Sequence, residues 1–483
     1  MAQQRTVIRG GHVITMDPVL GDFPVGDILI EDGRIVQVAS SIGIIDCEVI
    51  DARGHLVLPG LVDTHRHTWQ SLLRGICADW TLGDYYFGIR LGISPVFSPD
   101  DLHLGQVLGG AEALNAGVTT ILDFSHTNNT PEHSDAAIAG IKDSGVRAVH
   151  CHGFFESSPT GTKFGPHADR LRDYRRLVEA ELSDADARVT AGVALSEPLG
   201  LPWQDTLNEI ATAREHGALM VNHTGCVWGS PLTFGIPELD ALGLLGPDMV
   251  HVHCNALTGH EWEILRRTDG KVSISVETEL NMGMGRPVFA RCREYGIAPT
   301  LSADVMSLNS GDLWHQARLG LGFARWDATH ELNIAGHMPE AVVSTAKDAL
   351  GWATVNGADA LGMSDQIGSL KPGKKADVIL VGGNSFEQHP RLDPYGTLIF
   401  QTTAHDVRTV LVGGEIVKLD GRLVHHDLAE LGRRADTAAR EIFARVEATG
   451  AILPGTPPGA WGAIDPMAQG YLAEARASVA AVR

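Results

Sequence analysis

Short segments rich in β-branched residues, with alternating apolar and polar positions, occupy both ends of the chain. Those near the start cover residues 7–9, 13–15, 28–30 and 34–38. The same alternating pattern recurs late in the chain, at residues 374–381 and 407–414. Such a pattern is typical of strands that bury one face. We therefore expect a small β-sandwich domain formed from the N- and C-terminal segments.

Between these ends, apolar runs alternate with segments of helical character. The candidate strands are residues 56–67, 119–124, 147–151, 189–195, 219–223, 249–254, 272–277 and 299–304. One helix start is marked by Ser98, an N-cap residue, followed by Pro99 and two acidic residues. Strands that alternate with helices form parallel sheets with right-handed crossovers, and eight such units close a (β/α)8 TIM barrel. The predicted fold class is therefore α/β.

These patterns predict four segments in the chain of 483 residues. Residues 1–57 and 367–425 would form the two parts of the β-sandwich, and residues 58–366 the barrel. Residues 426–483 would form a helical C-terminal extension with a Pro/Gly-rich stretch. We expect this extension at an oligomer contact or at the rim of the pocket.

Composition narrows the class of partner. The formal net charge is −21 and 44% of the residues are apolar. A chain this acidic does not favour nucleic acid or an anionic membrane surface, because both require basic patches. Six cysteines without a CxxC pair, and no long apolar span or signal-peptide pattern, indicate a cytoplasmic protein. We expect a small-molecule substrate and a homo-oligomer, a dimer or a tetramer.

Histidines and one carboxylate follow the predicted strands. His65 and His67 are two residues apart at the end of the first strand, so both side chains should share one face. His223, His253 and Asp304 end, or nearly end, the fifth, sixth and eighth strands. Because the strands of such barrels present their carboxyl ends to the active site, these side chains should converge. Imidazoles with one carboxylate suit Zn²⁺, although Fe²⁺, Mn²⁺ and Co²⁺ accept similar ligands.

This grouping predicts a hydrolytic metal site. A divalent ion bound there would lower the pKa of a water molecule toward neutrality and make hydroxide available. Asp304 could bind the ion and accept the proton of the water. His253 would contact the water or the substrate.

The motifs resemble those of the amidohydrolase superfamily, in its cytosine deaminase, chlorohydrolase and S-adenosylhomocysteine deaminase branch. They occupy residues 58–67, 72–75, 354–363, 367–377, 394–396 and 407–414. The resemblance extends over roughly residues 5–425 and implies a (β/α)8 barrel with a β-sandwich and metal-dependent hydrolysis. It also implies the roles of the site residues: metal ligands His65, His67, His223 and Asp304, and a catalytic His253.

Two departures from the family pattern matter. Relatives with two metal ions bridge them with a carbamylated lysine on the fourth strand, but no lysine occurs between Lys163 and Lys271. One metal ion per chain is therefore expected. Deaminases of the branch usually carry a glutamate three residues after the fifth-strand histidine, where this chain has Cys226. A thiol with a pKa of about 8.5 replaces a carboxylate poorly.

The seventh predicted strand provides a candidate acid in place of that glutamate. If Val272, Ile274 and Val276 face the helices, the alternating polar residues face the barrel interior. This places Glu277 at the pocket, to orient substrate or transfer protons, with Glu279 as a second candidate. An ion pair between Glu277 and Arg286 is the equally weighted alternative.

Other candidates for substrate binding lie just after the strands. They are Trp69, Gln70, Trp80, His126 and Cys226. A tryptophan near the barrel mouth could stack on a planar substrate or could serve only as lid packing.

The sequence as a whole predicts a metal-dependent hydrolase that acts on a planar, nitrogen-containing small molecule. Deamination or amide-type C–N hydrolysis is the first interpretation. Chlorohydrolase or carbamate hydrolase chemistry is the closest alternative, partly because the usual glutamate is missing. A lyase or decarboxylase on the same metal site, and a non-catalytic scaffold, are further alternatives.

Overall fold

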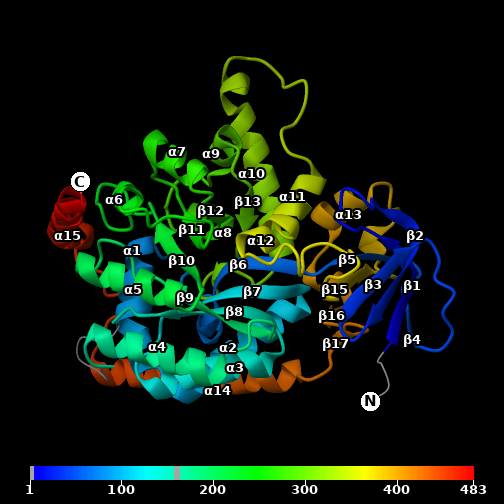
Figure 1. The fold of residues 1–483 in the computed structure, drawn as a ribbon, viewed down its shortest axis with the longest axis horizontal. Coiled ribbons are helices and arrows are strands. Elements are labelled where there is room, and N and C mark those ends of the chain that lie inside the picture. Colours follow the sequence, from blue (N-terminus) through cyan, green and yellow to red (C-terminus); the bar gives the residue numbers. More distant parts are fainter. Residues whose placement is uncertain (1–4, 157–163, 483) are drawn as a thin grey trace.

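The computed structural model describes residues 5–156 and 164–482 and contains two nine-stranded sheets (Figure 1). The first sheet has the order β18-β17-β16-β15-β5-β1-β2-β3, with β4 paired to β1. Its N-terminal strands are β1 (Arg5–Val13), β2 (Phe23–Glu31), β3 (Arg34–Ala39), β4 (Glu48–Asp51) and β5 (His55–Pro59). Its C-terminal strands are β15 (Val378–Gly382), β16 (Val407–Val412), β17 (Glu415–Leu419) and β18 (Arg422–Leu423).

The two ends of the chain meet in this sheet, as the alternating pattern predicts. β5 pairs antiparallel with β15, with Leu58 opposite Ile379. The strands form one continuous hydrogen-bonded sheet that bends back on itself: a Cβ built on Gly33 would lie 2.6 Å from the carbonyl oxygen of Gly413. Apolar residues from β1, β2, β3, β5, β15 and β16 fill its interior.

The second sheet is the barrel. Its parallel strands are β6 (Leu61–His67), β7 (Val118–Ser125), β8 (Arg147–Gly153), β9 (Val189–Ala194), β10 (Leu219–Thr224), β11 (Met249–His253), β12 (Lys271–Ile274), β13 (Pro299–Leu301) and β14 (Asp304–Val305). They follow the order β13-β12-β11-β10-β9-β8-β7-β6-β14. Because β13 pairs with β12 while β14 pairs with β6, the two are halves of one interrupted eighth strand that closes the barrel. The predicted (β/α)8 fold is confirmed.

Helices cover the barrel and extend its mouth. The first half of the chain contains η1 (Thr68–Leu73), α1 (Leu82–Tyr85), η2 (Tyr86–Ile93), η3 (Ser94–Val96), α2 (Pro99–Asn115), α3 (Pro131–Ser144), α4 (His167–Glu181), α5 (Trp203–Glu215) and α6 (Ile236–Ala241). The second half contains α7 (Gly259–Arg267), α8 (Val276–Asn281), α9 (Phe289–Tyr295), α10 (Leu313–Ile334), α11 (Ala346–Trp352), α12 (Val355–Ala360), η4 (Phe386–Gln388), α13 (Pro394–Gln401), η5 (Ala404–Asp406), α14 (Leu428–Thr449) and α15 (Ala460–Val482). Ser98 caps α2 as predicted, in a reciprocal capping box with Asp101.

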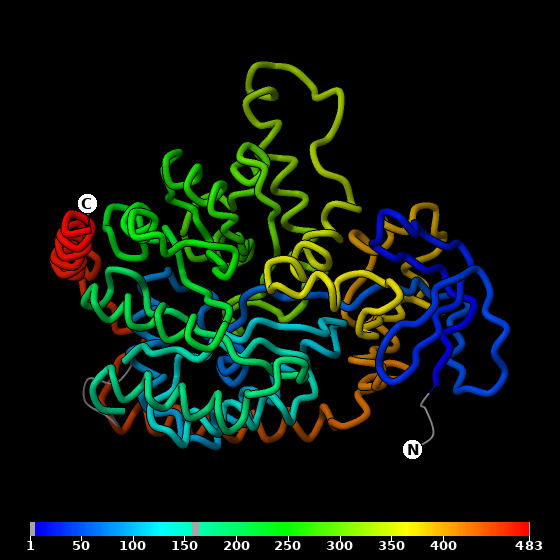
Figure 2. Tube along the Cα trace, viewed as in Figure 1, coloured from blue at the N-terminus to red at the C-terminus, as the bar shows by residue number. Residues whose placement is uncertain are grey.

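The C-terminal helices pack along the barrel. α14 runs beside α2, where Arg445 donates to the carbonyl oxygen of Val96 over 2.8 Å and pairs with Asp101. α15 packs against α5 and α6, at the left edge of the molecule in Figure 2. The segment before it contacts α1, because Thr456 donates a 2.6 Å hydrogen bond to Asp84. Across the described residues, no helix is both long enough and apolar enough to span a membrane.

One strand is shorter than the sequence predicts. β12 ends at Ile274, and the polypeptide turns into α8 at Val276. Glu279 stabilises this turn, because its Oε1 accepts a 2.9 Å hydrogen bond from the backbone N–H of Ser275. The predicted alternation therefore stops before Glu277.

Candidate active site

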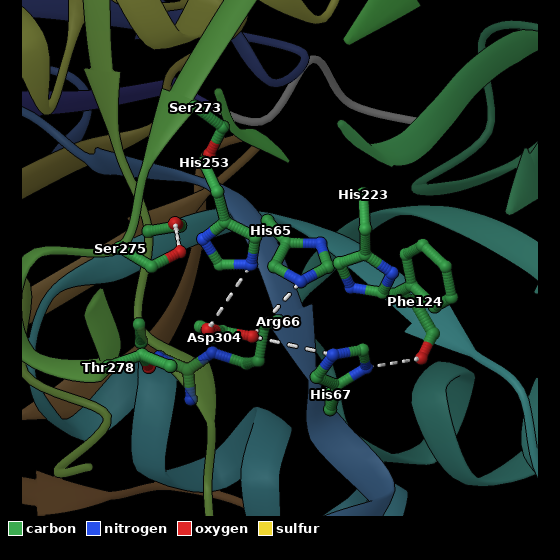
Figure 3. Close-up of polar contacts among 12 residues, drawn as sticks. His65, Arg66, His67, Phe124, His223, His253, Ser273, Ser275, Thr278 and Asp304 are labelled. Carbon is green, nitrogen blue, oxygen red and sulfur yellow. Dashed lines mark hydrogen bonds and ion pairs between the residues drawn. The ribbon is translucent and has the colours of Figure 1, made fainter. Parts of the chain in front are cut away.

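Five side chains from four strands of the barrel meet at the carboxyl ends of these strands (Figure 3). β6 provides His65 and His67, β10 provides His223, β11 provides His253 and β14 provides Asp304. One nitrogen from each of His65, His67 and His223 lies within 4.8 Å of the others. The convergence expected from the spacing is present.

Three of these histidines direct Nε2 into the site, because a hydrogen-bond acceptor holds Nδ1 of each ring. Nδ1 of His67 lies 3.3 Å from the carbonyl oxygen of Phe124, and Nδ1 of His223 lies 3.2 Å from Oε1 of Glu197. Nδ1 of His253 lies 3.2 Å from Oε1 of Glu279. A carbonyl or carboxylate oxygen only accepts, so each Nδ1 carries a proton, and Nε2 of His67 and of His223 can offer a free lone pair. Metal-binding histidines are held in the same way.

Asp304 lies at the centre of the group. Its Oδ1 is 3.1 Å from Nε2 of His65 and 3.4 Å from Nε2 of His67, and its Oδ2 is 4.0 Å from Nε2 of His253. Burial opposes ionisation of Asp304, but the surrounding histidines hold its pKa below the ordinary value. Its Oδ2 is buried without a hydrogen-bond partner among the described residues. Lone pairs from imidazoles around such an oxygen suit a divalent cation, so the residues fit a metal ion.

The backbone is strained where it presents two of these side chains. His253 has a φ of 76° and Asp304 a φ of 58°, in the left-handed region that residues other than glycine rarely adopt. Such strain costs on the order of 1–3 kcal/mol per residue and concentrates at functional sites. Between the two β6 histidines, Arg66 turns away and pairs with Asp63 over 2.8 Å.

Glu277 is not brought to this centre. It lies on α8, where its Oε2 accepts a 3.0 Å hydrogen bond from Gln316 and its Oε1 is 3.8 Å from His315. The predicted alternative partner, Arg286, pairs instead with Asp327. Glu279, the second candidate, is fully buried and contacts His253. Because β12 ends early and the chain continues as α8, Glu279 contacts the site histidine in place of Glu277.

A further acid at the site was missed by the sequence analysis. Glu197 lies just beyond β9, lines the pocket and accepts from His223 and from Nη1 of Arg90. Burial opposes its ionisation, but Arg90 and His223 together hold its pKa far below the ordinary value. A search of the fourth strand end for any acid, and not only for lysine, would have found it. Arg90, on η2, had no sequence signal that pointed to the site.

The pocket above the site holds about 780 Å³, including its mouth. His67, His223, His253 and Asp304 are at its base. Its walls are mostly apolar and aromatic, and include Tyr86, Phe155, Met282, Met284, Trp461 and Ile464. Because Trp461 and Ile464 belong to α15, the C-terminal extension is at the pocket rim, one of the two places expected for it.

Of the predicted substrate contacts, the structure brings only Cys226 to the pocket lining. Burial raises the pKa of its thiol to about 12, so Cys226 is a neutral side chain at neutral pH. Trp69 is fully buried, edge-on to Phe97 and to His126, and His126 in turn lies edge-on to His67.

The remaining two candidates support the wall from behind. Gln70 is buried and donates a 2.7 Å hydrogen bond to the hydroxyl of Tyr85, which lines the pocket. Trp80 packs on Gly88 of η2, where a Cβ would be 2.5 Å from its ring. In the structure, the contacts of Gln70 and Trp80 are therefore packing contacts behind the pocket lining.

The barrel, the converging histidines and the buried aspartate are the features of a hydrolase that can bind a metal ion at the carboxyl ends of its strands. Residues 56–417 match the family model described as the amidohydrolase family, and the chain belongs to that family. The resemblance found in the sequence motifs is thereby confirmed.

Comparisons with individual proteins agree. The chain is 28% identical to a 5'-deoxyadenosine deaminase of Methanosarcina barkeri over 452 residues, covering 92% of this chain and 99% of the relative. It is 31% identical to a 5-methylthioadenosine/S-adenosylhomocysteine deaminase of Symbiobacterium thermophilum, covering 91% and 99%. The fold is similar to that of a zinc-bound adenosine deaminase from Xanthomonas campestris, with a TM-score of 0.79, 21% identity and coverage of 91% and 98%. An atrazine chlorohydrolase from Arthrobacter aurescens, complexed with zinc and atraton, also gives a TM-score of 0.79, with 20% identity and coverage of 90% and 100%.

Proposed function

We propose that the protein is a zinc-dependent deaminase of a planar amino-substituted heterocycle. One zinc ion per chain would be held by His65, His67, His223 and Asp304. The observation that carries the proposal is the unpartnered Oδ2 of Asp304 amid imidazole nitrogens, at the base of an apolar pocket. An ion at this position supplies Lewis-acid activation of a water molecule.

The chain's own residues handle the protons. Asp304 is ionised, so its carboxylate can accept a proton from the attacking water and deliver it to the leaving nitrogen. His253 points its Nε2 toward the same space because Glu279 holds its Nδ1. Burial opposes protonation of His253, but Glu279 and Asp304 raise its pKa, so the protonated ring can donate a hydrogen bond from Nε2 to a ring nitrogen as negative charge develops there. The apolar walls exclude bulk water and so strengthen both interactions.

The relatives support the choice of substrate class. The relatives above are named for deamination of adenosine derivatives, which present an amino group on a planar purine. Tyr86, Phe155 and Trp461 provide aromatic surface in the pocket for such a ring. Aminopurines and their nucleosides are therefore the first compounds to test.

The neutral thiol of Cys226 favours a second candidate. A leaving group such as chloride needs no proton, so a site without the usual glutamate could release it as well. Dechlorination of a chlorinated heterocycle is the alternative that this observation supports.

The test is product analysis with zinc-reconstituted enzyme. We expect ammonia from at least one aminopurine, with ¹⁸O from labelled water in the ring product, and no turnover by Asp304→Asn. Chloride release from chlorotriazines without ammonia from any amine would replace the first proposal by the second. A product without labelled oxygen, under conditions where the product does not exchange oxygen with water, would indicate a lyase instead.

We also propose the finer details expected from the sequence: a homo-oligomer, dimeric or tetrameric, in the cytoplasm. All six cysteines are free thiols, which fits a reducing compartment. Light scattering during size-exclusion chromatography measures the assembly, and elemental analysis measures the zinc. A monomer, or two equivalents of zinc in fully active protein, would contradict these points.

A further inference from the structure

A buried ion pair lies behind one of the three clustered histidines. Arg90 of η2 donates from Nη1 to Oε1 of Glu197, and Nδ1 of His223 donates to the same oxygen over 3.2 Å. The Arg90 side chain is 4% exposed and the Glu197 side chain 11%. The chain of contacts thus runs from the segment over the barrel mouth to β10.

Arg90 is itself held in place from both sides. Its guanidinium carbon is 3.9 Å from the centroid of the Phe155 ring and 5.6 Å from that of Tyr86. A cation over an aromatic face is stabilised most when it is desolvated, as here. The guanidinium and the imidazole of His223 donate to the same carboxylate oxygen, so the position of Arg90 fixes the oxygen that accepts from His223.

His223 differs from the other clustered histidines in this respect. Nδ1 of His67 is held by the backbone carbonyl of Phe124, which no side-chain substitution removes. Nδ1 of His65 has no hydrogen-bond partner among the described residues. In the described part of the chain, His223 is the one member of the group whose Nδ1 is held by a charged side chain.

We infer that Glu197 is a positioning residue for the metal ligand His223, and that Arg90 keeps the Glu197 carboxylate in place. The inference rests on the proposed metal site. It assigns to the end of the fourth strand a carboxylate that orients a ligand, in a chain whose fifth strand lacks the usual glutamate. Loss of either residue should weaken metal binding, because removing such outer partners typically costs about 10- to 100-fold in affinity.

The structure provides a matched control. Glu279 accepts from Nδ1 of His253 over 3.2 Å, the same distance, but His253 is outside the group of three histidines that could hold an ion. If orientation of a ligand is what matters, Glu197→Ala and Glu279→Ala should differ in metal affinity although both remove a carboxylate from an imidazole.

The experiment measures metal affinity by chelator competition in full-length protein, with Zn²⁺ and with Co²⁺. We expect Glu197→Ala and Arg90→Met to bind each ion about 10- to 100-fold more weakly. Glu197→Gln should lose less, because its amide oxygen still accepts the N–H. Glu279→Ala should keep its affinity within about threefold while its kcat falls. The Co²⁺ absorption bands should change in Glu197→Ala and not in Glu279→Ala, because they report the geometry of the ligands.

Circular dichroism identifies variants that fail to fold. If Glu197→Ala does not fold, Glu197→Gln takes its place in the comparison, because it changes the shape of the side chain least. Wild-type affinity and an unchanged Co²⁺ spectrum in folded Glu197→Ala and Arg90→Met would overturn the inference. Absence of stoichiometric metal binding by the wild-type protein would instead overturn the proposed function.

Discussion

At the scale of single residues, the positions next to the histidines matter as much as the histidines. Glu197 and Glu279 each hold one imidazole by Nδ1, so the free Nε2 atoms face a common space. The strained backbone of His253 and Asp304 orients these two side chains at a local cost in stability. Glu277, by contrast, contacts Gln316 and His315, which are outside this group of histidines.

Separate substitutions of the two acidic residues of α8 test this distinction. We expect Glu277→Ala to keep kcat/KM within about twofold, because its carboxylate contacts Gln316 outside the pocket lining. Glu279→Ala should lower kcat/KM about 10- to 100-fold, the usual cost of losing a partner that orients an imidazole. Steady-state kinetics of the zinc-loaded variants measures both. The reverse ranking would restore Glu277 as the acid at the site.

At the scale of elements, the C-terminal helix completes a pocket that the barrel alone would leave open. α15 contributes Trp461, Ile464 and Met467 to the lining, and η2 contributes Tyr86 and Arg90. The indole of Trp461 is 6.2 Å from the ring of Tyr86, so two elements distant in sequence form one aromatic wall. Specificity for the part of the substrate away from the reacting carbon should reside here.

Trp461→Ala should therefore raise KM about 10-fold or more while kcat changes less, because one lost apolar contact costs about 1–3 kcal/mol in binding. Trp326→Ala on α10 is a suitable control, since this side chain is 48% exposed and outside the pocket lining. The measurement is the kinetic profile on whichever heterocycle is turned over. Equal KM values for both variants would separate α15 from substrate binding.

At the scale of the whole molecule, buried polar contacts join the terminal sheet to the barrel. Lys418 of β17 donates a 2.6 Å hydrogen bond to the carbonyl oxygen of Asn115, at the end of α2. Burial lowers the pKa of Lys418 to about 8, from an ordinary value of 10.5. Arg147 of β8 and Asp377, just before β15, form a second link, with two hydrogen bonds of 2.8 and 2.9 Å.

The depressed pKa of Lys418 predicts a pH dependence of stability. Between about pH 8 and 10.5 the folded protein has lost this proton while the unfolded chain still binds it. Because stability rises with pH wherever the unfolded state binds more protons, this residue should favour folding increasingly across that window. The Tm of the wild type, measured relative to that of Lys418→Met, should rise from pH 8 to 10. A difference that is constant with pH, or one that moves the other way, would contradict this.

Local patterns in the sequence were sufficient to predict the architecture and the inner part of the site. Strand and helix periodicities are local, so they predicted both sheets and placed His65, His67, His223, His253 and Asp304 at strand ends. A (β/α)8 barrel brings those ends together whatever the details of packing. Such patterns do not show which carbonyl or thiol groups surround a given residue.

Which other side chains reach the centre depended on contacts between segments distant in the sequence. Arg90 and Glu197 are 107 residues apart and meet through the path of η2 over the barrel mouth. Glu279 replaces Glu277 because a strand ends three residues early, at Ile274, and Trp461 comes from the C-terminal helix. Such contacts depend on the exact course of loops and on long-range packing, which residue periodicity does not encode.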